Sequence, residues 1–143
     1  MTHKEIQTIE KAEAALAAAE PLPFPLSSKG LEPFIAGGFT GVEKTDWVFP
    51  GLRERVGAVL RNCPIDRLVD GHAGARPYRV APVSTSPSTR LLQACGVAMV
   101  HRDDAVLCFI GHGAAATGSF YEALNLAALH RLNLIVLART QDL

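Results

Sequence analysis

The chain has no surplus of charge, because its 14 lysines and arginines balance its 14 aspartates and glutamates. Nucleic-acid binders and proteins that bind anionic membranes usually carry a basic excess, so this balance argues against both kinds of partner. No apolar run approaches the ~18 residues that a membrane-spanning helix needs. The opening residues "MTHKEIQTIEK" are too polar and charged for a secretory signal. We therefore expect neither a nucleic-acid nor a membrane partner.

Cysteine is also scarce, and Cys63, Cys95 and Cys108 are widely spaced. An odd number of cysteines without a Cys-x-x-Cys sequence argues against a disulfide framework and against a zinc site. Unpaired thiols suit a reducing compartment, so we expect a cytoplasmic protein. The length of the chain suits one hydrophobic core. We divide the chain into an N-terminal helix and connector (residues 1–36) and a folded domain (residues 37–143).

The N-terminal part begins with strong helix formers over residues 4–19, whose apolar residues recur near helical spacing. Prolines at positions 21, 23 and 25 end this helix and predict an extended connector over residues 20–34. The connector carries Leu22, Phe24 and Leu26. These side chains need cover, which a partner subunit could supply, and we expect self-association or a tight partner.

The last third of the chain has the clearest pattern. The runs "AVLCFI" (105–110) and "NLIVLA" (133–138) are typical of strands that are buried on both faces of a parallel sheet. Between them, Ser119 and Glu122 match a capping box at the start of a helix that extends to about residue 131. A strand, a helix and a second strand in this order predict two parallel strands and an α/β fold.

The glycine-rich turn "GHGAAATG" (111–118) follows the first of these strands, at the sheet edge where ligands of open parallel sheets bind. Gly111, Gly113 and Gly118 leave the backbone bare, so an anion could reach free N–H groups at the helix start. On spacing alone, these glycines could equally serve close packing of the helix against the strand. We interpret His112 as a neutral polar side chain at the turn, or as a weak hydrogen-bond donor to an anion. A zinc ligand is less favoured, because no other histidine has matching spacing.

Nucleophilic or acid–base catalysis by the chain alone finds little support in the sequence. No Gly-x-Ser-x-Gly nucleophile turn occurs, and Asp103 with Asp104 fits a solvated loop before a strand. A further alternative is a protein that binds phosphate or nucleotides in general, because the glycine turn could hold any phosphate group.

Two stretches in the same order resemble one known family. "GHGAAATGSFYEALNLAALHRLNLIVL" (111–137) is similar to the pyrophosphate-binding segment of the alpha subunit of thiamine-diphosphate-dependent 2-oxoacid dehydrogenases, which include the pyruvate, branched-chain and acetoin enzymes. "TDWVFPGLRERVGAVLRNCPIDRLV" (45–69) resembles that family's Asp-Trp/Tyr-Val-Phe-Pro-x-Tyr-Arg-x-His segment. Together the similarity covers about residues 37–140.

The resemblance implies a doubly wound parallel sheet of the thiamine-diphosphate-binding fold, here shortened. It also implies that the alpha subunit holds the diphosphate through Mg²⁺, while a beta subunit supplies the glutamate that activates the cofactor. The metal-binding aspartate of the family falls on His112, and the Asn-Asn pair that closes the metal site falls on Thr140 and Gln141. Leu52 replaces a tyrosine that touches diphosphate, Arg53 remains, and Arg55 replaces a histidine.

These replacements together point to an abandoned metal site. We therefore expect a shortened alpha-type domain that does not catalyse alone and acts as a partner or structural subunit, as a homo-oligomer or with a beta-type chain. The alternative is a cofactor-binding alpha-type subunit that a beta-type chain completes. The sequence does not decide whether the chain is an enzyme. Thiamine diphosphate stays a candidate ligand without its Mg²⁺. We assign no catalytic or metal-binding residue. The candidate cofactor-binding residues are Gly111, His112, Gly113, Ala114, Gly118, Ser119 and Arg53.

Overall fold

A computed structural model describes residues 2–19, 27–69, 76–83, 86 and 88–140. Its strands β1 (Trp47–Phe49), β2 (Val106–Gly111) and β3 (Leu134–Arg139) form one parallel sheet in the order β1-β2-β3. The two strands predicted in the last third are therefore confirmed as parallel neighbours. Helix α6 (Gly118–His130) connects them, as predicted.

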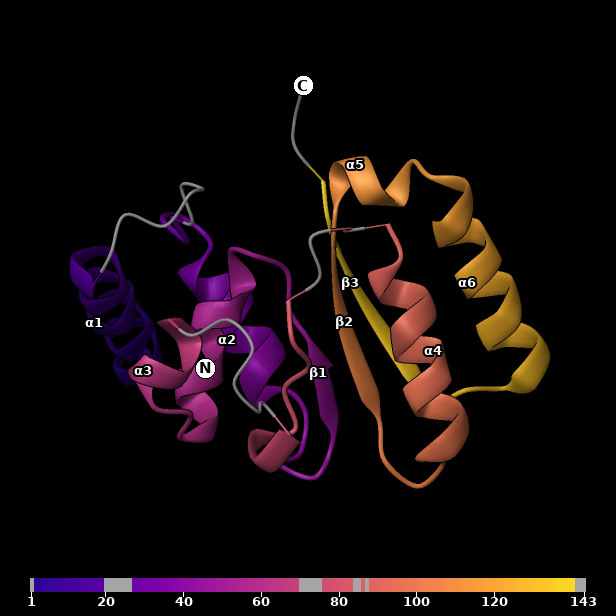
Figure 1. Cartoon of the computed structure of the whole chain (residues 1–143), viewed down its shortest axis with the longest axis horizontal. Coiled ribbons are helices and arrows are strands. Elements are labelled where there is room, and N and C mark those ends of the chain that lie inside the picture. Colours follow the sequence, from indigo (N-terminus) through magenta and orange to yellow (C-terminus); the bar gives the residue numbers. More distant parts are fainter. Residues whose placement is uncertain (1, 20–26, 70–75, 84–85, 87, 141–143) are drawn as a thin grey trace.

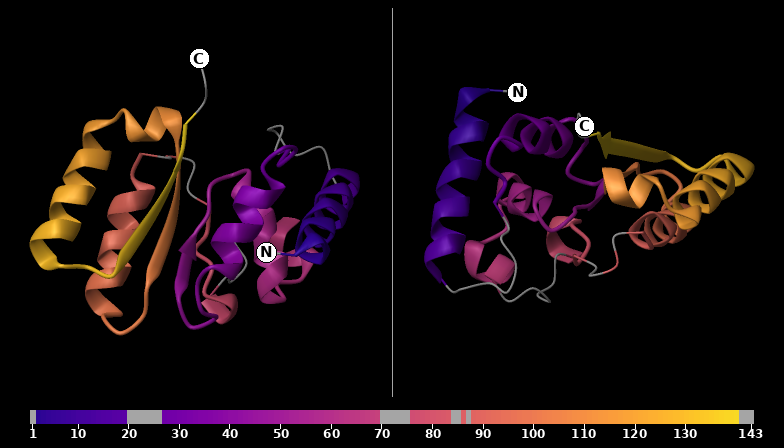
Figure 2. Two further views of the ribbon diagram at one scale, coloured as in Figure 1. Left: turned by 180° about the vertical axis from the view of Figure 1, so that it is seen from behind. Right: turned by 90° about the horizontal axis from the view of Figure 1, so that it is seen from above.

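Helices lie on both sides of this sheet. Figure 1 views the sheet nearly edge-on, with α1 (His3–Ala19), α2 (Glu32–Thr40) and α3 (Ile65–Val69) on one side. Helix α4 (Arg90–Val100) and α6 lie on the other side. Both views of Figure 2 agree, since α1 and α6 lie at opposite extremes of the molecule in each. The remaining elements are the 3-10 helices η1 (Glu54–Arg61) and η2 (Arg76–Tyr78) and the short helix α5 (His112–Ala115).

The single core expected from the length is divided by the sheet into two clusters, because successive side chains of a strand point to opposite faces. Leu107 and Phe109 of β2 pack with α1, α2 and η1, whereas Val106, Cys108 and Ile110 pack with α4 and α6. The α/β class is therefore confirmed. The doubly wound thiamine-diphosphate fold, and the division at residue 36, remain predictions.

Helix α2 corrects the expected extended connector, which reached residue 34, because the helix begins at Glu32. It contains Gly37 and Gly38, although glycine is a poor helix former. Packing explains the second glycine, because a Cβ on Gly38 would lie 2.4 Å from Cζ of Phe109. Leu22, Phe24 and Leu26 of the expected connector lie outside the described residues.

The segment after β1 forms the 3-10 helix η1 rather than an α-helix, and α4 begins after Thr89 without a side-chain cap. Asp104 is less solvated than expected, since its carboxylate pairs with Arg79 at 3.6 Å and with His101 at 3.7 Å. No helix within the described ranges is long and apolar enough to cross a membrane.

The edge of the sheet where the strands begin is held by buried polar groups. Asp46 accepts hydrogen bonds from the backbone N–H groups of Glu43 and Ala105, each at 2.8 Å. Arg61 is 6% exposed, and its Nη atoms donate to the carbonyls of Glu43 at 2.9 Å and Asp46 at 2.7 Å. The loop before β1 is thereby joined to the residue before β2.

The glycines give a direct test of this packing. In Gly57→Ala the new Cβ would lie 2.4 Å from ring atoms of Phe39 and 2.6 Å from Cγ2 of Ile35, both buried. We expect a loss of about 1–3 kcal/mol in the free energy of unfolding, because the core cannot accept another methyl group. The matched control is Gly96→Ala, whose Cβ meets nothing within 4 Å inside α4 and should stabilise by roughly 0.5–1 kcal/mol. Urea unfolding measures both, and a Gly57→Ala chain as stable as the parent would contradict the contact between α2 and η1.

Candidate functional site

The candidate site lies at the edge where the parallel strands end, as the sequence predicts. β2 ends at Gly111, α5 starts at the next residue, and α6 follows after a two-residue turn. Figure 1 places α5 at the upper end of the molecule, beyond the end of β2. The glycine turn therefore occupies the position at which open parallel sheets bind ligands.

The three glycines of this turn are not required by packing in the described structure. A Cβ added to Gly111, Gly113 or Gly118 would meet no heavy atom within 4 Å. None of the three has a positive φ, so their backbone conformation does not require glycine either. The interpretation that they serve close packing of helix and strand is thus wrong here. What remains is a bare backbone that a ligand or partner could approach.

The start of α6 corrects the predicted capping box. The residue before the helix is Thr117, with φ −97° and ψ 153°, and no side chain caps the first turn. Ser119 Oγ instead donates to the carbonyl of Ser88 at 2.9 Å, and Glu122 is exposed. Because Ser119 has only one hydroxyl proton, this bond leaves its side chain as an acceptor toward any ligand. The hydroxyl therefore joins α6 to the segment before α4.

Backbone N–H groups at the start of α6 are available. Gly118 and Ser119 occupy its first two positions, and neither N–H donates to another described residue. The N–H groups of a first helical turn have no partner within the helix, and the helix dipole makes this end partly positive. Thirteen residues of α6 stand behind that end. The arrangement suits an anion such as the phosphate groups of a ligand.

His112 and Ala114 are the other predicted residues of the turn. His112 is exposed and makes no hydrogen bond or ion pair with any described residue, whereas the Ala114 side chain is buried. Among the described residues no group of three or more His, Cys, Asp or Glu side chains could hold a metal ion. Mg²⁺ prefers oxygen ligands, so the imidazole of His112 does not suit it.

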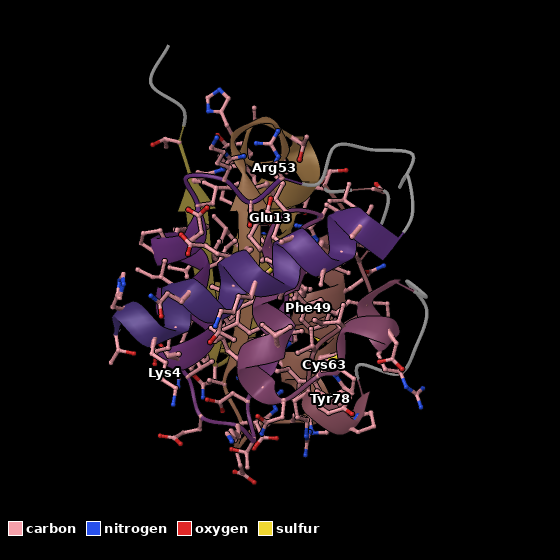
Figure 3. The ribbon with its side chains drawn as sticks, turned by 90° about the vertical axis from the view of Figure 1, so that its left-hand side faces the viewer. Lys4, Glu13, Phe49, Arg53, Cys63 and Tyr78 are labelled. Atoms are coloured by element: carbon pink, nitrogen blue, oxygen red, sulfur yellow. The ribbon has the colours of Figure 1, made fainter. Side chains whose placement is uncertain are left out.

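Arg53 comes from a different segment and is exposed, four residues beyond the end of β1. Figure 3 shows it above Phe49, toward the same end of the molecule as α5 in Figure 1. No hydrogen bond or ion pair joins Arg53 to residues 111–119 within the described chain. The structure thus places Arg53 toward the same edge of the sheet as the turn, without a hydrogen bond or ion pair to the turn.

A buried cationic group below the turn was missed by sequence reasoning. Arg90, the first residue of α4, is 4% exposed, and its Nη1 donates to the carbonyl of Phe109 at 2.8 Å. Burial lowers the pKa of the Arg90 guanidinium, while the nearby Cys108 and Glu54 oppose that shift. An arginine at the start of an amphipathic helix is usually solvated, so no signal in the sequence indicates its burial.

The cysteines offer no nucleophile near this edge. All three are buried and free. Burial raises the pKa of the Cys108 thiol to about 12, against the opposing effect of Arg90. The thiolate is the reactive form, so Cys108 is inert at neutral pH.

Comparison with known proteins identifies the family. A family model described as "Dehydrogenase E1 component" matches residues 2–139. The chain is 32% identical to the 3-methyl-2-oxobutanoate dehydrogenase subunit alpha of Mycobacterium tuberculosis, over 71% of this chain and 30% of that protein. It is 26% identical to the pyruvate dehydrogenase E1 component subunit alpha of Mycoplasma genitalium, over 74% of this chain and 33% of that protein. It is 27% identical to the 2-oxoisovalerate dehydrogenase subunit alpha of Bacillus subtilis, over 80% of this chain and 41% of that protein.

The chain therefore belongs to the dehydrogenase E1 component family, and its relatives are alpha subunits of 2-oxoacid dehydrogenases. The resemblance found in the two sequence stretches is confirmed. The chain spans about a third of the length of the curated relatives that it matches.

The donor set at the turn predicts that one substitution cannot restore a metal site. His112→Asp adds one hard oxygen ligand, but octahedral coordination of Mg²⁺ needs several more. We expect the variant to bind thiamine diphosphate with Mg²⁺ no better than the parent within about tenfold, or ~1.4 kcal/mol. His130→Asp, at the other end of α6, controls for the added charge. Calorimetry showing tight, Mg²⁺-dependent binding only in His112→Asp would contradict this account.

Proposed function

We propose that this chain is a thiamine-diphosphate-fold domain of the E1 alpha type that does not catalyse alone and serves as a partner or structural subunit. The observation that carries the proposal is the turn over residues 111–119. Its backbone is open and its helix start offers free N–H groups, yet the residue at position 112 is an exposed histidine. A site for anions is thus retained without the carboxylate that a Mg²⁺-bound diphosphate needs.

The ligand that this site supports best is a phosphate or diphosphate group held without a metal ion. The N–H groups of Gly118 and Ser119 and the dipole of α6 would face its oxygen atoms. Arg53, at the same sheet edge, could add a charge-assisted hydrogen bond from its exposed guanidinium. Thiamine diphosphate meets this description through its diphosphate end.

A catalytic role for the chain alone is not supported by its residues. The family resemblance assigns the activating glutamate to a beta subunit, and Cys108 is inert at neutral pH. The rival proposal, a cofactor-binding alpha-type half completed by a beta-type chain, is favoured by the retained Arg53 and the open turn. The fold alone does not choose between them, because function belongs to the site.

A partner or a second copy of the chain is part of this proposal. Large apolar side chains are exposed on α4 and α6: Val100 is 78%, Tyr121 63% and Leu129 74% exposed. Exposed apolar residues on neighbouring helices are common at contact surfaces between subunits. We expect light scattering to report an assembly larger than one chain, and a clean monomer at high concentration with no partner recovered would count against it.

The purified chain should not decarboxylate pyruvate or branched 2-oxoacids when thiamine diphosphate and Mg²⁺ are supplied. The physical reason is that position 112 carries no carboxylate for Mg²⁺, and that the family resemblance assigns the activating glutamate to a beta subunit. Release of CO₂ is the measurement, with the cofactor and Mg²⁺ alone as the background. Turnover by the isolated chain above that background would sink the proposal of a non-catalytic domain.

A further inference from the structure

Arg90 is an unusual residue for the end of a parallel sheet. A guanidinium carries five N–H donors and a permanent charge, so its burial is costly unless those donors are used. Arg90 is 4% exposed and uses Nη1 for the carbonyl of Phe109 at 2.8 Å. Its Nε is buried and has no hydrogen-bond partner in the described structure. An unpartnered buried donor of this kind costs about 1–3 kcal/mol and calls for an explanation.

The bond to Phe109 has a clear local cause. The ladder between β1 and β2 ends at the pair of Phe49 and Cys108, and the chain continues into Pro50. Along a parallel strand the backbone N–H and C=O groups of alternate residues point to the same neighbouring strand. The carbonyl of Ala105 accepts from the N–H of Trp47, so the carbonyl of Phe109, four residues later, also points toward β1. The carbonyl of Phe109 thus lies beyond the last paired residue, and Arg90 supplies its donor. The bond fixes β2 two residues before Gly111.

A second link, between Arg90 and the segment that carries Arg53, is electrostatic: no salt bridge or hydrogen bond joins Arg90 to Glu54 in the described structure, but the charge of Glu54 acts on the guanidinium. The Glu54 carboxylate and the Arg90 guanidinium both crowd Gly51, where an added Cβ would lie 2.2 Å from Oε2 of Glu54 and 3.1 Å from Nη1 of Arg90. Glu54 is 8% exposed, so its charge lies in the same buried environment as the guanidinium. Glu54 is also the neighbour of Arg53 in the chain.

A third connection runs through the start of α4. Ser88, two residues before Arg90, accepts the hydrogen bond of Ser119 Oγ at 2.9 Å. The start of α6 is therefore joined to the same short segment that carries Arg90. The end of β2 is thus bonded to Arg90 itself, the Arg53 segment is linked to Arg90 by charge, and the start of α6 is bonded to Ser88, two residues before Arg90.

We propose that Arg90 is a positioning residue for the anion site, which holds the glycine turn and the Arg53 segment in the relation that lets one anion contact both. This inference rests on the proposed function of the turn. Because Nε is buried, Arg90 does not touch the ligand itself. Its role is to fix the positions of Gly111 and Arg53 through Phe109 and Glu54.

Arg61 provides a matched control within the same chain. It is also a buried arginine, 6% exposed, with an unpartnered Nε, and it also donates to backbone carbonyls. It lies at the opposite edge of the sheet, where the strands begin. Loss of its hydrogen bonds should therefore destabilise the fold as loss of those of Arg90 does, without changing the anion site.

The test uses inorganic pyrophosphate, without divalent metal, and calorimetry on the full chain. We expect Arg90→Lys to raise the Kd at least about tenfold, because an ammonium group does not reproduce the planar, forked donors with which the guanidinium reaches the Phe109 carbonyl. Arg61→Lys should lower the melting temperature to a similar extent but leave the Kd within about twofold, as distant independent sites do. Glu54→Gln keeps the shape, removes the charge, and should weaken binding even if Arg90→Lys does not fold.

The outcomes separate the two claims. Parent-like Kd values in both Glu54→Gln and a folded Arg90→Lys, or an equal loss of affinity in Arg61→Lys, would overturn the positioning role and leave the anion site in place. A parent chain that does not bind pyrophosphate would overturn the proposed function itself. Weakened binding in the Arg90 and Glu54 variants alone supports the inference.

Discussion

The central strand β2 is the constraint on which the rest of the structure depends. All five residues from Val106 to Ile110 are buried, so each face of β2 needs a covering layer of helices. Side chains hold the backbone near both ends of the strand. Asp46 accepts from the N–H of Ala105 before the strand, and Arg90 donates to the carbonyl of Phe109 near its end. Burying these charged groups is tolerated because their hydrogen bonds satisfy backbone groups that the ladder leaves unpaired.

The position of the glycine turn is set by this strand. It follows β2 directly, and it is held from one side by Arg90 and from the other by the bond between Ser119 and Ser88. A rigid support below an open backbone is what an anion site needs, because the N–H groups must already point outward before the ligand arrives. The turn keeps that property although position 112 carries no carboxylate. The chain therefore combines a strand end that is held by side chains with an exposed histidine at position 112.

Sequence patterns predicted the elements that local chemistry decides. β2, β3 and α6 were predictable because unbroken apolar runs on either side of a helical pattern leave few alternatives. α2 was missed because Gly37 and Gly38 suggest a turn, whereas the need for close contact with Phe109 decides in favour of a glycine inside a helix. Ser119 was assigned to a cap because its spacing to Glu122 fits, yet its hydroxyl has a tertiary partner in Ser88. The burial of Arg90 depends wholly on long-range packing, which no local pattern reports.

Binding of the diphosphate end of a ligand by residues 111–119 without Mg²⁺ is tested most directly by NMR. Amide chemical shifts of the full chain are followed during titration with thiamine diphosphate. We expect the largest shifts at Gly111, Gly113, Gly118 and Ser119, and we expect them to be the same with and without Mg²⁺. Shifts confined to other parts of the chain, or shifts at the turn that arise only when Mg²⁺ is present, would contradict it.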